Sequence, residues 1–480
     1  MLQVGVTYAA ILVTLVAVAV YAITVSRRMD VTTVKTFLSA KNSTSAFRLA
    51  WCFFSSGMGS WTLFSFPEIG VIAGSWGVIG YTLSGVLGLV VLALVGPFSR
   101  SVLGEGVTLT DFIFNRYGRV MQIYVGLVSL FYQFISFASE LTCVGLLATT
   151  LSPTAEPAIP IIAVAIITNI YLVIGGLPAS LATDVWQGIA VMLLVLVVCI
   201  AMFVHVHVPE GAWGETQIAA FTTSGFETLV TLCIAITASN LFYTGYWQRV
   251  YAAKDDATLR RACLFAAGFV IPFTVFLALT GMVSKLAYPD GMYFFAILVD
   301  MGTFWQILVA LVIASLASSV CDSIQLGMSA ELVTNFPTLT LTHARLVCVL
   351  LNIPAVYIAL KNISVLTLFL IADLLCAATV GPMLLGAWKR THPMAAFLGC
   401  LSGLLTIFFH GLYVQGTFVG AIKWFGLPET LYSYNTMVTF IFALIVPVVV
   451  TIALSFVLPR QKISRSSYVP ATTPAPVHLA

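Results

Sequence analysis

Long apolar segments recur along the whole chain and restrict the possible folds more than any other feature. About thirteen of them run for roughly 17–30 residues, the length of helix that crosses the hydrocarbon core of a bilayer. Strand-like alternation is absent, and the segments are too long for barrel strands. The sequence therefore predicts an all-α polytopic membrane protein with about 13 transmembrane helices. Their approximate bounds are 3–25, 47–73, 77–98, 120–150, 159–175, 181–204, 227–248, 262–285, 303–330, 344–360, 363–388, 394–415 and 436–458.

The low charge content excludes several classes of protein. Only 8% of the residues are charged and 60% are hydrophobic, whereas soluble chains carry about 25% charged residues. Such a chain cannot cover a water-facing surface, which excludes soluble globular proteins, disordered proteins and nucleic-acid binders. The nine cysteines are scattered without a CxxC pair, so we expect buried thiols and no metal beyond a transported cation. We expect no organic cofactor, and the lipid bilayer and a small solute as the only partners.

The basic residues indicate the orientation of the spans, because Lys and Arg gather in cytoplasmic loops. With the N-terminus outside, eighteen of the 21 Lys and Arg residues fall in predicted inner loops, at their edges or in the tail, including Arg116 and Arg249. The first segment has Arg27 and Arg28 after it and no charge before it, so we expect a retained helix, not a signal peptide. We therefore predict an outer N-terminus, a cytoplasmic C-terminus and a plasma-membrane location.

Two of the apolar segments are interrupted by polar residues and glycines. The second segment contains Ser55–Trp61 followed by Pro67 and Glu68, and the seventh contains Thr237–Arg249. The two lie five spans apart and run in opposite directions, which is typical of an inverted-repeat transporter. Unwound backbone carbonyls there suit a small cation, and the ends of half-helices orient a polar solute. The alternative is that the glycines only permit close packing of helices.

Charged and polar residues within the spans are the candidate functional groups, because a charge in the bilayer core is costly. The carboxylates are Glu68, Glu140, Asp184, Asp322 and Asp373. A structural pair or a position near the membrane surface is the alternative for each of them. Rings flank both breaks, where they are suited either to hold a flat polar solute or simply to pack. They are Trp61, Phe64, Phe66, Tyr243, Tyr246 and Trp247.

The ninth segment carries three serines and one carboxylate on neighbouring helical faces. Ser315, Ser318, Ser319 and Asp322 follow the spacing i, i+3, i+4 and i+7. Hydroxyl and carboxylate oxygens are the ligands of hard cations. Alternatively, the serines bond back to carbonyls of their own helix.

At these motifs the chain resembles the sodium:solute symporter family, and within it the urea active transporter branch. The match extends from about residue 37 to 390, and its most specific part is Asn240–Phe242 followed by Gly245–Asp255. The other matching segments are Phe37–Asn42, Ser56–Ser60, Leu63–Gly70, Ser139–Leu141, Gly175–Gly176, Thr183–Gly188 and Ile371–Leu375.

The resemblance implies a LeuT-type 5+5 inverted-repeat core formed by the second to eleventh spans. The first repeat would be residues 37–204. Residues 205–415 would hold an outer loop, the second repeat and one additional helix. The remaining parts are an extra helix and inner loop at 1–36, an outer loop and last helix at 416–459, and a disordered tail at 460–480.

The resemblance also implies a sodium site. Its ligands map onto the backbone of Ser55 and Met58 in the second span, and onto Leu311, Ala314 and Ser315 in the ninth. The family often has a serine where this chain has Ala314. This departure keeps proton coupling open, through Asp322, Glu68 or Asp184.

The resulting hypothesis is a secondary active transporter, not an enzyme. It would import urea or a related small amine-bearing solute, including a polyamine, with Na⁺ or H⁺ by alternating access. The alternatives are a passive urea channel and a symporter for a different small solute. The candidates for solute binding or coupling are Trp61, Thr62, Phe64, Glu68, Glu140, Asp184, Tyr243, Tyr246, Trp247 and Asp322.

Overall fold

The computed structural model describes residues 2–28, 38, 40–103, 108–336, 340–361, 363, 365–426 and 433–459. Within these residues the chain is helical and forms no strand, apart from an isolated bridge between Thr44 and Ala253. The predicted tail at 460–480 lies outside the described residues. The principal helices are α1 (Val4–Ser26), α3 (Ala46–Gly57), α4 (Thr62–Leu103), α5 (Leu109–Tyr117), α6 (Arg119–Leu151), α7 (Ala158–His205), α9 (Thr223–Asn240), α10 (Thr244–Ala252), α11 (Asp256–Ala287), α13 (Thr303–Asn335), α14 (Leu341–Ala359), α15 (Val365–Leu384), α16 (Pro393–Gln415) and α18 (Tyr434–Val457). Short helices in the connections are α8 (Ala212–Thr216), α12 (Tyr293–Met301) and α17 (Phe418–Trp424), with a 3-10 turn at Leu385–Ala387.

Nine of the described helices are long and apolar enough to cross a membrane, and ten are when the bent pair α9 and α10 counts as one span. Two of the nine are too long for a single crossing. The 42 residues of α4 and the 48 of α7 would measure about 63 Å and 72 Å if straight, about twice the hydrocarbon thickness.

Each of these two helices reverses at a glycine with a positive φ, Gly74 in α4 and Gly176 in α7. The rings of Trp61 and Tyr81 are twenty positions apart in sequence, yet their centroids lie 6.0 Å apart, so α4 folds back on itself. A side chain at position 74 would also meet the carbonyl of Ile218 at 2.7 Å, so only glycine fits there. With both helices divided, each of the thirteen predicted apolar segments corresponds to a helix, a half-helix or a broken pair.

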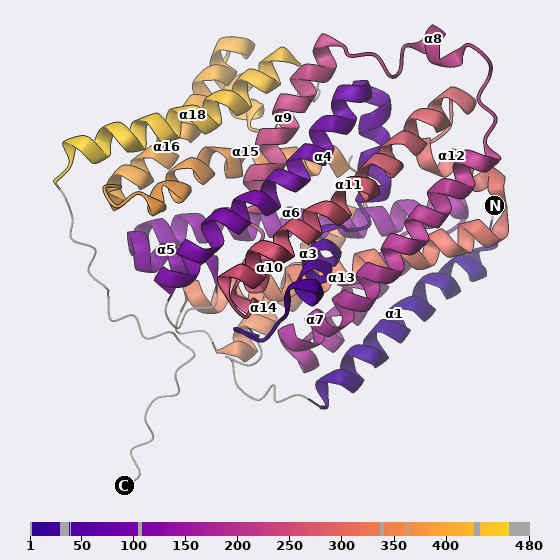
Figure 1. Cartoon of the computed structure of the whole chain (residues 1–480), viewed down its shortest axis with the longest axis horizontal. Coiled ribbons are helices and arrows are strands. Elements are labelled where there is room, and N and C mark those ends of the chain that lie inside the picture. The colour runs from indigo at the N-terminus through magenta and orange to yellow at the C-terminus, as the bar shows by residue number, and fades with distance from the viewer. Residues whose placement is uncertain are drawn as a thin grey trace.

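The additional helices flank a central bundle (Figure 1). On one side α1 packs along α7 and α13, and on the other α16 and α18 pack together and against α15. Most of the largest fully buried side chains belong to the bundle, among them Trp247, Arg249 and Tyr171. The polar groups described below therefore lie in the interior of the protein and not against lipid.

Two unwound segments meet within this bundle. The first, Met58–Trp61, separates α3 from α4. The second, Leu241–Tyr243, separates α9 from α10, whose axes differ by 59°. The Tyr243 hydroxyl donates to the carbonyl of Ser56 at 3.0 Å, which joins the second break to the end of α3, just before the first break. Both breaks lie inside the segments where the sequence predicted them.

Candidate functional site

Glu140 of α6 holds the first break in its unwound form. Its Oε2 accepts hydrogen bonds from the backbone N–H and the hydroxyl of Ser60, at 2.9 and 2.5 Å. The Thr62 hydroxyl donates to the carbonyl of Gly59 at 2.7 Å. A Cβ at position 59 would overlap Glu140 Oε1, so glycine is what allows the carboxylate to approach the backbone. Glu140 has no solvent exposure, and its Oε1 has no hydrogen-bond partner.

A central pocket lies beside this carboxylate, and its empty space, open solvent included, is about 660 Å³. A second carboxylate, Asp373 of α15, also lines it, and its Oδ1 is buried without a hydrogen-bond partner. The pocket thus brings together two acids from different helices and a set of rings. The rings are Trp61, Tyr81, Tyr132, Tyr243, Tyr246 and Phe369, and the other lining residues are Ser56, Gly57, Ser136, Leu232, Ile236, Ser239, Asn240, Val320, Ile324 and Leu370.

Trp61 closes one end of the pocket by contacts with rings from three places in the chain. Its centroid lies 5.4 Å from that of Phe369 in α15, 5.3 Å from Phe66 and 6.0 Å from Tyr81. These are ordinary separations for aromatic pairs. Trp247, in contrast, does not line the pocket. It is fully buried, and its indole N–H donates to the carbonyl of Leu241 at 2.8 Å. This bond stabilises the backbone of the second break.

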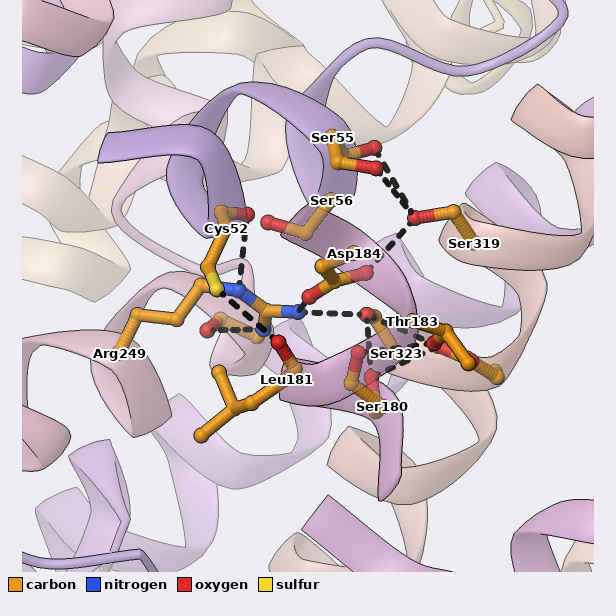
Figure 2. Close-up of polar contacts among 12 residues, drawn as sticks. Cys52, Ser55, Ser56, Ser180, Leu181, Thr183, Asp184, Arg249, Ser319 and Ser323 are labelled. Atoms are coloured by element: carbon orange, nitrogen blue, oxygen red, sulfur yellow. Dashed lines mark hydrogen bonds and ion pairs between the residues drawn. The ribbon is translucent and has the colours of Figure 1, made fainter. Parts of the chain in front are cut away.

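Arg249 of α10 and Asp184 of α7 form an ion pair that is completely buried (Figure 2). Each guanidinium nitrogen also donates to a neutral acceptor, namely the carbonyls of Cys52 and Gly245 at 3.0 and 2.9 Å and the hydroxyl of Ser323 at 2.9 Å. The charge pattern predicted Arg249 at an inner loop, but the structure places it in the core. A buried guanidinium is tolerated only when its charge and its donors find such partners.

Ser319 of α13 joins this ion pair to the helix before the first break (Figure 2). Its hydroxyl donates to Asp184 Oδ1 at 2.8 Å and lies 2.8 Å from the hydroxyl of Ser55 in α3. Of the expected cation ligands, Ser55 thus contacts α13, at Ser319, one turn beyond Ser315. Ala314 and Met58 are buried, and the carbonyl of Ser315 accepts from Gln187 and Ser318 at 3.2 and 2.9 Å. The fifth expected ligand, Leu311, is half-buried one turn earlier on α13.

Among the residues that the structure describes, the partners of Asp322, also on α13, are hydroxyl groups. Its carboxylate accepts from Tyr171, Ser180 and Ser323 at 2.8, 3.0 and 3.1 Å. No ion pair to Asp322 occurs among the described residues. Because Arg249 neutralises Asp184, the three charged groups together leave one negative charge in excess when both acids are ionised.

The structure therefore separates the predicted site residues into groups. Trp61, Glu140, Tyr243 and Tyr246 meet in the central pocket. Asp184 and Asp322 belong to the polar cluster around Arg249, while Phe64 and Glu68 line a different cavity. Thr62 begins α4, where its hydroxyl bonds back to Gly59.

Several residues of the site were not selected from the sequence. Asp373 was noted only as a charge within a span, and its position opposite Glu140 depends on how α15 packs. Tyr81, Tyr132 and Phe369 carry no signal that distinguishes them from other membrane aromatics. The sequence does carry a signal for the burial of Arg249. This residue follows directly on the seventh apolar segment, with no loop residues between them.

The comparisons with known proteins agree with this architecture. A sequence model of the sodium:solute symporter family matches residues 37–333. The spermidine transporter DUR31 of Candida albicans is 26% identical over 439 residues, which cover 87% of this chain and 84% of that protein.

Among solved structures, a Na⁺-coupled sialic acid symporter superposes with a TM-score of 0.72 at 16% identity, covering 95% of this chain and 99% of that one. The nucleobase-cation-symport-1 family transporter Mhp1 gives a TM-score of 0.55 at 13% identity, covering 89% and 96%. MhsT in complex with L-phenylalanine gives 0.57 at 13% identity, covering 86% and 98%.

These structural relatives establish the expected LeuT-type fold, and they are transporters, not enzymes. The family model covers more than half of the chain, and its description implies sodium-coupled movement of a solute across a membrane. The chain therefore belongs to the sodium:solute symporter family.

Proposed function

We propose that the solute is a small, positively charged amine of the polyamine class, carried through the central pocket by cation symport and alternating access. The observation that carries this proposal is the pair of unpartnered carboxylate oxygens, Glu140 Oε1 and Asp373 Oδ1, in one buried pocket. A buried polar atom without a partner is costly. An ammonium group supplies both the opposite charge and the N–H donors that these oxygens lack.

The rings of the pocket support the same class of solute. Tyr132, Tyr243 and Tyr246 are almost fully buried, and Trp61 forms the end wall. A cation over the face of such a ring is stabilised by about 2 kcal/mol when the site is desolvated. The methylene stem of a polyamine would also lie against these apolar surfaces. The similarity to a protein named as a spermidine transporter adds to this support.

For the coupling ion we propose a site between α3 and α13, at the backbone of Ser55 and Met58 and at Leu311, Ala314 and Ser315. Carbonyls at an unwound segment and a serine hydroxyl on the facing helix are suitable oxygen ligands for a small cation. An ion at this junction would hold the first broken helix against α13. Its occupancy would then be linked to the geometry of the break that forms the solute pocket.

Urea is the second candidate solute. It is flat and rich in donors, so the ring walls and carboxylate oxygens of the central pocket would also suit it. It carries no charge, however, and would leave Glu140 and Asp373 without a counter-charge. The substrate test must therefore compare a charged amine directly with urea.

Uptake of radiolabelled spermidine and radiolabelled urea into a transport-deficient host tests the proposal, with Na⁺ and pH varied independently. We expect concentrative spermidine uptake that depends on Na⁺. Unlabelled putrescine should inhibit this uptake more strongly than unlabelled urea does. Accumulation of urea without spermidine would overturn the polyamine assignment. Flux indifferent to both ion gradients would indicate a channel. Uptake that follows only the pH gradient would assign coupling to a proton, with Asp322, Glu68 and Asp184 as the candidate carriers.

A further inference from the structure

A second cavity lies outside the central pocket, and its empty space, open solvent included, is about 580 Å³. Four parts of the chain form it, namely α4, α6, α15 and the segment around the start of α12. Among the described residues, its walls are apolar or aromatic except for Glu68, the one charged side chain there. The lining residues are Leu63, Phe64, Glu68, Leu146, Met292, Tyr293, Phe295 and Val365.

Residues close together in sequence line the two cavities. Trp61, the last residue of the first break, lines the central pocket, whereas Phe64 and Glu68 of α4 line the second cavity. Phe64 and Glu68 have the spacing i and i+4, which places them on one side of α4, about 6 Å apart along its axis.

The same relationship recurs on α15. Val365 lines the second cavity, and Phe369 and Asp373 line the central pocket. Their spacing i, i+4 and i+8 again selects one side of the helix. The segment Trp61–Glu68 and helix α15 therefore each line both cavities.

Aromatic pairs line each cavity. The rings of Trp61 and Phe369, which line the central pocket, have centroids 5.4 Å apart. The rings of Phe64 and Phe295, which line the second cavity, have centroids 4.6 Å apart.

The Glu68 carboxylate makes no hydrogen bond or ion pair with any residue that the structure describes. It is half-buried, so part of the side chain is open to the cavity. A single negative charge between apolar walls attracts cations strongly, because these walls screen the field less than water does. The predicted topology directs α4 outwards from Trp61 to Glu68, which places this cavity on the outer side of the central pocket.

We propose that the second cavity is a docking site for one ammonium group of the solute on its way to the central pocket. The Glu68 carboxylate would hold the ammonium group, and the rings of Phe64 and Phe295 would contact the methylene stem. This inference rests on the proposed function, since a neutral solute would gain nothing from the charge. The same site would favour amines that carry more charges.

The decisive experiment measures the KM and the maximal rate of spermidine uptake for Glu68→Gln, which keeps the shape of the side chain and removes its charge. We expect KM to rise about tenfold, because the variant loses one charge-assisted hydrogen bond to the solute. The maximal rate should stay unchanged. Glu68→Asp should retain most of the affinity. The increase should be larger for spermidine than for putrescine, and smallest for a monoamine.

Glu215→Gln is the matched control, because Glu215 is an exposed carboxylate on α8, away from both cavities. It should leave KM unchanged. An equal rise in KM in both variants would overturn the proposal, because it would indicate a general effect of negative surface charge.

Met292→Lys gives a second test that does not alter Glu68. Met292 lines the cavity and is 42% exposed, so it tolerates a lysine, whose charge should also raise KM.

Unchanged KM in both Glu68→Gln and Met292→Lys, at normal surface expression, would overturn the docking site. A fall in maximal rate without a change in KM would do the same. Failure of the proposed function is distinguishable, because the wild-type protein would then take up no spermidine at all.

Discussion

Arg249 of α10 and Asp184 of α7 form an ion pair with no solvent exposure on either side chain. The pair joins α10, the half-helix after the second break, to α7. Ser319 extends the connection to α3, and Ser323 extends it towards Asp322. Four helices thus share one polar network at the level of the proposed cation site, so movement of one half-helix must change the contacts of the others.

The first prediction concerns this ion pair. Asp184→Leu and Arg249→Met should each destabilise the protein by about 3–5 kcal/mol, because each leaves the opposite charge buried without its partner. The double variant should be more stable than either single one. Thermal unfolding of the purified proteins in detergent checks this order. If the double variant loses as much as both single variants combined, the two side chains do not act as a pair.

The second prediction concerns the two acids of the central pocket. Glu140→Gln and Asp373→Asn should each weaken spermidine uptake about ten- to a hundredfold, since each removes one charge-assisted hydrogen bond to an ammonium group. Surface expression should stay normal, because a neutral amide costs less in the membrane interior than a carboxylate. Ser136→Ala, which changes a neutral residue of the same pocket, serves as the control. Full uptake by both acid variants would show that these carboxylates do not bind the solute and have a structural role.

The third prediction concerns the coupling ion. Ser315→Ala should raise the Na⁺ concentration that gives half-maximal uptake, because it removes a proposed hydroxyl ligand. Ala314→Ser should lower this concentration or leave it unchanged, because it adds an oxygen at the position where the family often has serine. Uptake measured against Na⁺ at constant pH and ionic strength tests both. Insensitivity of the wild-type protein to Na⁺, together with dependence on the proton gradient, would refute the sodium assignment.

The fourth prediction concerns orientation. The distribution of Lys and Arg predicts an outer N-terminus and a cytoplasmic C-terminus. An epitope tag after Ala480 should therefore be labelled by antibody only after the cells are permeabilised, and a tag before Met1 in intact cells as well. Labelling of the C-terminal tag in intact cells would contradict the thirteen-span topology, because an odd number of crossings requires the termini on opposite sides.

Much of the architecture follows from the order of residues alone. Apolar segments of bilayer length predict the helices, since lipid offers no partner for an unpaired backbone group. The two breaks are predicted by Gly57 and Gly59 in the second segment and by the polar run before Arg249 in the seventh. Such residues interrupt a membrane helix where protein or enclosed water can satisfy the unwound backbone. These are local properties, and they do not depend on which helix packs against which.

The pairing of side chains across helices was decided by the tertiary structure. Glu140 and Asp373 are separated by more than two hundred residues, and they line one pocket only because α6 and α15 pack against each other. Arg249 has the sequence position of a loop-edge residue, but Asp184, two carbonyls and Ser323 together stabilise its charge in the core. The energy of a buried charge depends on its partners in space. The sequence by itself therefore determined the spans, the breaks and the list of intramembrane acids, whereas packing decided which acid faces the solute pocket and which is neutralised by arginine.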